Sequence, residues 1–125
     1  MNILGIDHGT KRIGVAIARG GVKIAYPLTT ILNDSQTVDS IKTLIEIEKV
    51  TLIVLGLPRN LKAQDTQQTR LVREFKDDIS ELGIDVHFQD ETTSTDRAIE
   101  RGAGKADKDA WAAALILQDY LEGVR

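Results

Sequence analysis

Residues 2–28, NILGIDHGTKRIGVAIARGGVKIAYPL, contain the pattern that decides the expected fold. Residues 2–8 are an apolar run that ends in polar residues, which is typical of a buried strand. Residues 12–19 place Ile and Val on one face and Gly and Ala on the other, which indicates a second strand. Gly20-Gly21 can supply the positive φ angles of a tight hairpin, so residues 22–28 are predicted to return as a third strand. The chain therefore opens with three antiparallel strands.

The remaining residues are expected to alternate between helices and strands. Helices are predicted where apolar residues recur at every third or fourth position, and strands where short apolar runs occur. The expected order is a helix from about 36, a strand at 51–55, a helix at 65–82, a strand at 84–88, a short helix near 95–101 and a helix at about 108–122. Apart from the short helix, this order is βββαβαβα, which predicts a single α/β domain over residues 1–125, with a mixed five-stranded sheet and helices on both of its faces.

The spacing also predicts which side chains are buried. Asp34 or Ser35 is expected to cap the first helix. The second helix is expected to turn four residues toward the core, namely Leu71, Phe75, Ile79 and Leu82. Strand alternation points His8 away from the side that carries Asp7, and we interpret it as a turn or surface histidine rather than a catalytic base.

The composition excludes several classes of protein. A chain of 125 residues fits one domain, and 42% hydrophobic with 28% charged residues is ordinary for a folded globular protein. Without cysteine, neither a disulfide framework nor a thiolate metal site can form. No apolar run approaches ~20 residues, and the N-terminus lacks a secretory pattern. We therefore expect a cytoplasmic protein that does not span a membrane.

Three carboxylates stand where strands end or a helix begins. Asp7 ends the first strand behind an apolar run, Glu91 follows the fifth strand, and Asp109 opens the last helix. A charged group next to an apolar run is costly unless it is paired or bound to a metal ion. Ligands of open α/β sheets collect beyond the strand ends, so the three side chains are expected to converge. Three hard oxygen ligands suit Mg²⁺ or Mn²⁺, which predicts a metal-dependent catalytic site.

Each carboxylate also has an ordinary structural interpretation. Asp7 can cap the turn that follows it, Glu91 can be a surface turn residue, and Asp109 can favour the positive end of the helix dipole. In addition, Asp7-His8-Gly9-Thr10 matches the D-x-G-T turn with which actin-like ATPases and sugar kinases cradle phosphates. A phosphate-binding domain is therefore an alternative hypothesis. Proteins of that kind duplicate the fold over two domains, however, and this chain has room for one.

Basic residues are concentrated in two regions in spite of a net charge of −3. One group lies in or beside the predicted loops of the first half, namely Lys11, Arg12, Arg59 and Lys62. The other lies in the last third of the chain, namely Arg97, Arg101, Lys105 and Lys108. Such patches can hold a phosphate backbone, although a solvated surface would have the same composition.

Four segments resemble the RuvX (YqgF) family, a group of small RNase H-like nucleases also described as Holliday junction resolvases. The first segment is LGIDHGTKRIGVA at residues 4–16, and the second is VLGLP at residues 54–58. The third is DETTST at residues 90–95, and the fourth is KADKDAWAAALILQDYL at residues 105–121. The segments occur in the family's order and span the whole chain.

The resemblance implies an RNase H-like fold and metal-dependent cleavage of phosphodiester bonds, in the maturation of the 5′ end of pre-16S rRNA. The family's three acidic residues fall on the positions already selected, Asp7, Glu91 and Asp109, which are therefore expected to bind Mg²⁺ or Mn²⁺ and to catalyse hydrolysis. With two ions, Asp7 would be the shared ligand. The expected substrate is nucleic acid, RNA rather than DNA, and the side chains expected to bind it are Lys11, Arg12, Arg101 and Lys105.

Two departures from the family pattern leave other functions open. Thr92 stands where the family has arginine, and the stretch from Thr95 to Lys105 is shorter than usual. Both changes concern substrate handling rather than the acidic residues. The alternatives to an rRNA nuclease are a DNA endonuclease that acts on Holliday junctions and a catalytically silent module that binds nucleic acid or protein.

Overall fold

The computed structural model describes residues 1–58, 62, 64–91 and 108–123. Along this part of the chain the elements are β1 (Asn2–His8), β2 (Arg12–Ala18), β3 (Tyr26–Leu32), α1 (Thr37–Glu48), β4 (Val50–Pro58), α2 (Gln67–Ser80), β5 (Asp85–Glu91) and α4 (Lys108–Glu122). The expected succession of strands and helices is confirmed, while the short helix expected near 95–101 lies outside the described residues. None of the helices described is both long and apolar enough to cross a membrane.

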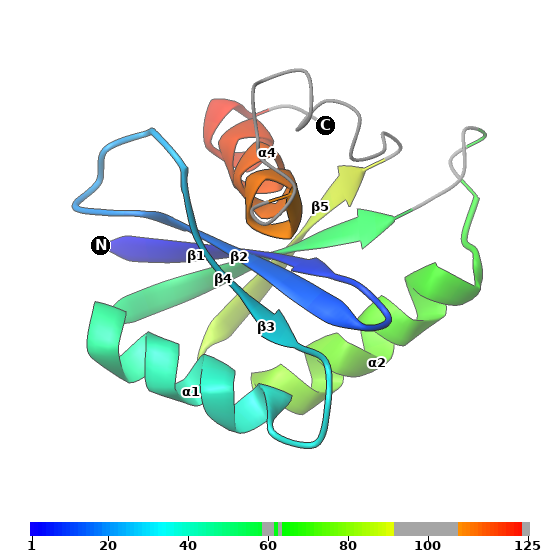
Figure 1. Cartoon of the computed structure of the whole chain (residues 1–125). Helices are drawn as coiled ribbons and strands as arrows, with labels where there is room; N and C mark the ends of the chain where they lie inside the picture. Colours follow the sequence, from blue (N-terminus) through cyan, green and yellow to red (C-terminus); the bar gives the residue numbers. More distant parts are fainter. Residues whose placement is uncertain (59–61, 63, 92–107, 124–125) are drawn as a thin grey trace.

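The sheet formed by the described strands has the order β3-β2-β1-β4-β5. β1 and β2 pair antiparallel, as do β2 and β3, whereas β4 runs parallel to both β1 and β5. α4 covers one face of this mixed sheet, and α1 and α2 cover the other (Figure 1). Because β1, β4 and β5 are parallel, their carboxyl ends meet at one edge of the sheet.

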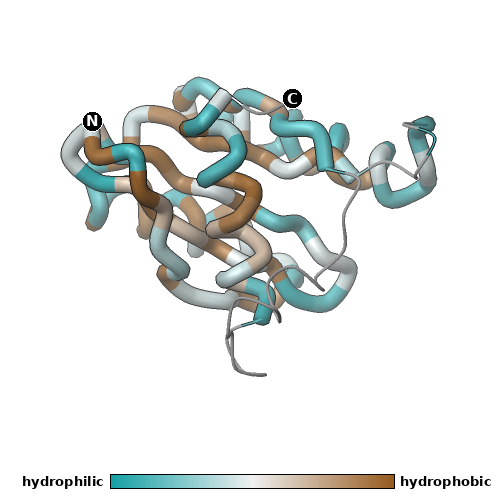
Figure 2. Tube along the Cα trace, turned by 90° about the horizontal axis from the view of Figure 1, so that it is seen from above, coloured by the Kyte–Doolittle hydropathy of each residue, from teal (hydrophilic) through white to brown (hydrophobic). Residues whose placement is uncertain are grey.

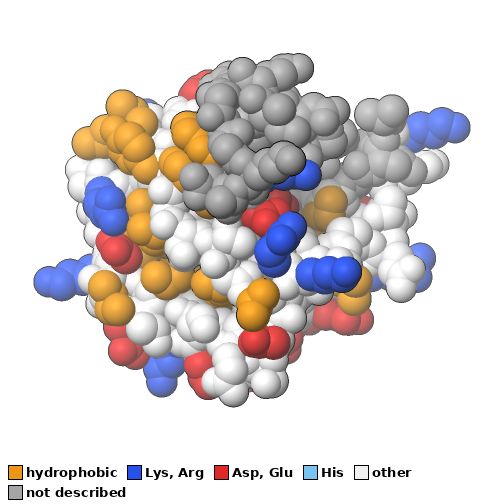
Figure 3. Space-filling view, in the orientation of Figure 1, with side chains coloured by type: hydrophobic (Ala, Val, Ile, Leu, Met, Phe, Trp, Pro, Cys, Tyr) orange, Lys and Arg blue, Asp and Glu red, His pale blue; other side chains and the backbone are white. Residues whose placement is uncertain are grey.

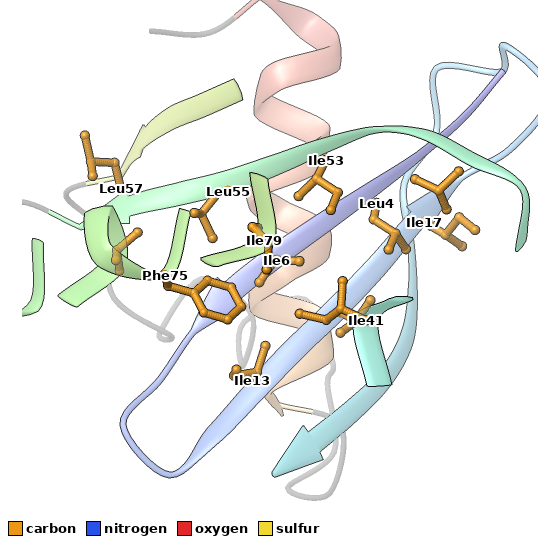
Figure 4. Close-up of a cluster of buried hydrophobic side chains, with 13 residues drawn as sticks. Leu4, Ile6, Ile13, Ile17, Ile41, Ile53, Leu55, Leu57, Phe75 and Ile79 are labelled. Carbon is orange, nitrogen blue, oxygen red and sulfur yellow. The ribbon is translucent and has the colours of Figure 1, made fainter. Parts of the chain in front are cut away.

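Each face of the sheet has its own hydrophobic core. The larger core, under α1 and α2, is built from the Leu and Ile side chains of alternate strand positions, packed against Ile41, Phe75 and Ile79 (Figure 4). The core under α4 uses smaller side chains, among them Ala16, Ala18, Val54 and Ala113. In Figure 2 the hydrophobic stretches accordingly run through the middle of the molecule, and hydrophilic ones lie around them. Small residues on both sides let α4 lie close to the strands, which matters for the site below.

The third strand begins later than the sequence predicted. The turn glycines have positive φ angles, as expected, but β3 does not include the first half of residues 22–28. That segment is bonded to α4: the Ala25 N–H donates to Oε1 of Gln118 (2.9 Å), and Nε2 of Gln118 donates to the carbonyl of Lys23 (3.1 Å). The chain therefore crosses toward the helix before it pairs with β2.

Two local expectations were also wrong. The N-cap of α1 is Gln36 without a side-chain cap bond, because the carboxylate of Asp34 accepts the Gln36 N–H (2.8 Å) in the turn before the helix. In α2, Leu71 is 37% exposed, and Val72 is fully buried in its place. Phe75 and Ile79 are buried as expected. The apolar side of this helix is thus formed by Val72, Phe75 and Ile79, and only the first of the expected positions is displaced, by one residue.

Candidate active site

Asp7 lies near the end of β1 on the face that α4 covers. The side chains of Leu4 and Ile6 belong to the core on the opposite face, so alternation along the strand directs Asp7 toward α4. On the neighbouring strand its partner is Gly14. The carboxylate therefore stands beside a position that has no side chain.

Gly14 makes room for the beginning of α4. A β-carbon at this position would overlap the backbone carbonyl oxygen of Asp109, in the first turn of the helix. The helix thus rests with its backbone on β2, next to Asp7. A role for Gly14 was not predicted from the sequence, although a glycine within a β-rich strand is a recognised sign of close backbone approach.

The negative charges of Asp7 and Asp109 repel each other. Asp7 is partly buried, and desolvation, followed by the negative charge of Asp109, raises the pKa of Asp7 from 3.8 to about 6. Near neutral pH, Asp7 is therefore ionised at a cost that a nearby cation would relieve. This pair is the part of the expected triad that the structure brings together.

Arg12 supplies positive charge on the Asp109 side of this pair. Its Nε lies 3.1 Å from Oδ2 of Asp109. The arginine side chain is 65% exposed and that of Asp109 is 25% exposed. The N-terminal end of α4 adds a favourable dipole for the same carboxylate. The negative charge of Asp109 is thus stabilised by Arg12 and by the helix dipole. The pKa of Asp7, in contrast, is raised by burial and by repulsion from Asp109.

Glu91 is the last residue of β5 and lies on the same face of the sheet. His87, four residues earlier, bonds to Tyr120 of α4, so alternation places Gln89 and Glu91 toward that helix as well. In the register across the strands Gly56 pairs with Gln89, and Glu91 lies opposite Pro58, further along. Gln89 is buried, and the sequence analysis did not single it out.

The donor chemistry of the site fits a divalent cation, because paired carboxylate oxygens are the ligands that Mg²⁺ and Mn²⁺ prefer. Within the described ranges, no three acidic or histidine side chains are grouped closely enough to hold a metal ion. Asp7 and Asp109 are two carboxylates of this kind, close enough for the charge of Asp109 to raise the pKa of Asp7. The assignment of Glu91 as a third ligand therefore stays a prediction.

Of the four side chains expected to bind substrate, the structure describes two. Lys11 is exposed in the turn between β1 and β2, and Arg12 begins β2. Arg101 and Lys105 lie outside the described residues. Figure 3 shows Lys and Arg side chains close to acidic ones on the right half of the face that it presents. Among the described residues, Arg12 brings positive charge to Asp109.

The turn after Asp7 was considered as a phosphate-binding turn, but the hydrogen bonds of Gly9 lie within the protein. The Gly9 N–H donates to the carbonyl of Arg12 (3.0 Å), so this donor is engaged within the turn. Asn33, at the end of β3, donates through Nδ2 to the carbonyl of Gly9 (2.8 Å) and supports the turn from the side. These bonds favour a structural role for Gly9 in the D-x-G-T segment.

His8 points away from Asp7 as expected, but it is not a surface histidine. Its ring packs on Phe75 with 4.5 Å between the centroids, and Nε2 lies 3.3 Å from Nδ2 of Asn33. Burial lowers the pKa of His8 below its ordinary value of 6.5. His8 therefore belongs to the α2 side of the sheet and is separated from the carboxylates by the strand itself.

Solved structures of similar fold come from Holliday junction resolvases. The structure of RuvC from Thermus thermophilus in complex with a Holliday junction substrate has a TM-score of 0.62 and 13% sequence identity, and covers 98% of this chain and 95% of that one. The fowlpox virus resolvase in complex with Holliday junction DNA has a TM-score of 0.58 and 14% identity, with 98% of each chain covered. These likenesses confirm the RNase H-like fold.

Relatives with higher identity carry the name "Putative pre-16S rRNA nuclease". One from Sulfurihydrogenibium sp. (strain YO3AOP1) is 36% identical over 129 residues, which are 96% of this chain and 89% of that protein. Another from Rickettsia typhi (strain ATCC VR-144 / Wilmington) is 34% identical over 134 residues, or 98% of this chain and 86% of that protein. The family model described as "RuvX: Holliday junction resolvase" matches residues 1–123. Because the match extends over almost the whole sequence, this chain belongs to the RuvX family.

Proposed function

We propose that this chain is a metal-dependent nuclease that hydrolyses phosphodiester bonds in RNA, in the maturation of the 5′ end of pre-16S rRNA in the cytoplasm. Membership of a nuclease family supports the reaction, and the names of relatives such as those of Sulfurihydrogenibium and Rickettsia support the substrate. The observation that carries the proposal is the proximity of Asp7, near the end of β1, to Asp109, in the first turn of α4, whose negative charge raises the pKa of Asp7. Two carboxylates in this setting need a cation for a low-energy ionised state.

Asp7, Asp109 and Glu91 would hold Mg²⁺ or Mn²⁺. When bound, such a cation supplies Lewis acidity toward the phosphoryl oxygens and makes water a stronger nucleophile. The protein's part is to present ionised carboxylates at a fixed place. Because Asp7 keeps its proton below about pH 6, cleavage should weaken as the pH falls through that value. Lys11, Arg12, Arg101 and Lys105 would contact the phosphates of the substrate.

The test is a cleavage assay with Asp7→Asn, which keeps the size of the side chain but removes its charge. Purified wild type should cut an RNA that contains the 5′ precursor segment in Mg²⁺ or Mn²⁺, and Asp7→Asn should be slower by more than about 100-fold. Asp39→Asn is the matched control, since Asp39 is exposed on α1 beneath the other face of the sheet. Undiminished cleavage by Asp7→Asn would refute the site, and a wild type that binds RNA without cutting it would indicate a silent binding module.

Cleavage of DNA four-way junctions is the second candidate function. The description of the matching family and the fold of the resolvase structures both favour it. The same assay separates the two functions when a four-way DNA junction and a duplex of equal length are added to the substrates. Preference for the junction over the RNA would replace the rRNA proposal while leaving the catalytic residues unchanged.

A further inference from the structure

The position of Arg12 is set by the backbone around it. As the first residue of β2, it pairs with Leu32 of β3, and its carbonyl accepts the Gly9 N–H. A β-carbon at Gly9 would overlap that carbonyl oxygen, so the tight turn depends on glycine there. Ile13 belongs to the opposite core, and alternation therefore sends the Arg12 side chain toward α4 and Asp109. The start of β2 thus places the guanidinium of Arg12 next to the carboxylate of Asp109.

The contact between Arg12 and Asp109 is nevertheless weak enough for a metal ion to replace it. It joins Nε to one carboxylate oxygen, and most of the arginine side chain is in solvent. An exposed ion pair of this kind contributes roughly 0.2–1 kcal/mol, so a divalent ion that gains two carboxylates can displace it. Once displaced, the guanidinium lies beside the site with its donors available to a phosphate.

We infer that Arg12 neutralises the charge of Asp109 while no metal ion is bound. When a metal ion binds, Asp109 leaves Arg12 and becomes a ligand of the ion. This inference rests on the proposed function. It assigns two consecutive roles to one side chain: Arg12 first neutralises Asp109 and then, when released, binds the substrate phosphate. Metal and substrate would thus be coupled, because each draws one member of the ion pair away from the other.

The test measures Mn²⁺ binding to the metal-free protein by titration calorimetry, without any substrate. If Arg12 competes with the ion, Arg12→Gln should lower the Kd for Mn²⁺ by roughly two- to fivefold, the range expected for an exposed ion pair. Arg12→Lys, which keeps the positive charge, should stay closer to wild type. In RNA cleavage Arg12→Gln should raise KM, because a phosphate contact is lost while metal binding improves. A lower Kd for Mn²⁺ together with a higher KM for RNA is the result expected if Arg12 exchanges Asp109 for the substrate phosphate.

Arg19→Gln is the matched control. Arg19 follows the other end of β2 and pairs with Glu48, with 2.9 Å from Nη2 to Oε1 and similar exposure of the two side chains, 53% and 20%. This variant removes the same charge and a comparable ion pair far from the carboxylates, so its Kd for Mn²⁺ should equal that of wild type.

The outcomes separate the inference from the function on which it rests. A Kd for Mn²⁺ that is unchanged or higher in Arg12→Gln overturns the inference, because Arg12 would then be indifferent to the ion or would hold Asp109 ready for it. If cleavage by wild type remains metal-dependent in that case, the proposed function stands. If wild type binds no Mn²⁺, both are overturned.

Discussion

Gly14 and Asp109 are in contact through their backbones: a β-carbon on Gly14 would overlap the carbonyl oxygen of Asp109. The first turn of α4 thus lies directly on β2. Asp7 is the partner of Gly14 on the neighbouring strand, so it lies beside this turn. This contact fixes how closely the backbone of Asp109 approaches β2, because neither the strand nor the helix backbone has a flexible group there that could adjust it.

Gly14→Ala should therefore displace the beginning of α4. We expect a loss of about 3 kcal/mol in the free energy of unfolding, at the upper end of the range for overpacking, together with loss of cleavage. Gly56→Ala is the comparison: there a β-carbon would lie 2.5 Å from Cδ1 of Ile116, the end of a flexible side chain, and about 1 kcal/mol is expected. Denaturant unfolding measures both, and equal losses would contradict the backbone contact.

The contribution of Asp7 to the stability of the metal-free protein should decrease as the pH rises from 4 to 6. In this window the unfolded chain releases the Asp7 proton at its ordinary pKa of 3.8, while the folded protein retains it up to about 6. The resulting penalty, on the order of 2–3 kcal/mol, is complete above pH 6. Asp7→Asn should therefore be more stable than wild type at pH 7.5 and similar to it below pH 4. Thermal unfolding in chelator, with Asp39→Asn as the control, measures the difference; an Asp7→Asn protein that is no more stable at pH 7.5 would exclude the penalty.

His8 should produce the opposite dependence. The unfolded chain takes up a proton on histidine as the pH falls through 6.5, and the folded protein resists because burial lowers the pKa of His8. The contribution of His8 to the free energy of unfolding therefore decreases below pH 6.5. His8→Gln, which cannot titrate, should lose less stability than wild type between pH 7.5 and 5. Parallel curves for the two proteins would show that the pKa of His8 is not lowered in the folded protein.

Substrate affinity should depend on salt through a small number of cations. Lys11→Ala, and likewise Arg101→Ala and Lys105→Ala, should each flatten the plot of log affinity against log salt by roughly one unit. Lys42→Ala is the control, since Lys42 is exposed on α1 at the opposite face from α4. Fluorescence anisotropy with single-stranded RNA, in Ca²⁺ to limit cleavage, gives the slopes. An equal change in Lys42→Ala would leave diffuse electrostatics as the explanation.

Local patterns in the sequence were sufficient for the elements whose faces are buried by regular alternation or helical spacing. β1, β2, β4 and the three described helices lie close to their expected positions for that reason. The start of β3 was missed because Gln118 binds the preceding segment from a position more than 90 residues away. No periodicity within the segment carries that information.

The site was predictable to a similar extent. Asp7 and Asp109 were selected because carboxylates next to apolar segments need an explanation, and in the structure the charge of Asp109 raises the pKa of Asp7. Their role as metal ligands stays a prediction. The ion pair of Arg12 with Asp109 and the contact at Gly14 depend on how closely α4 approaches the sheet. That distance results from the packing of small residues over the whole face, which a single stretch of sequence does not specify.

The pairing of the first strand with the last described helix has a consequence for biosynthesis. The ribosome makes Asp7 early and Asp109 about one hundred residues later, so a nascent chain can assemble the sheet and the core under α1 and α2 while its carboxylates are still apart. Contacts between such distant residues also form slowly. If Asp7 and Asp109 form the proposed metal site, that site is complete only after α4 docks on the alanine-rich face of the sheet.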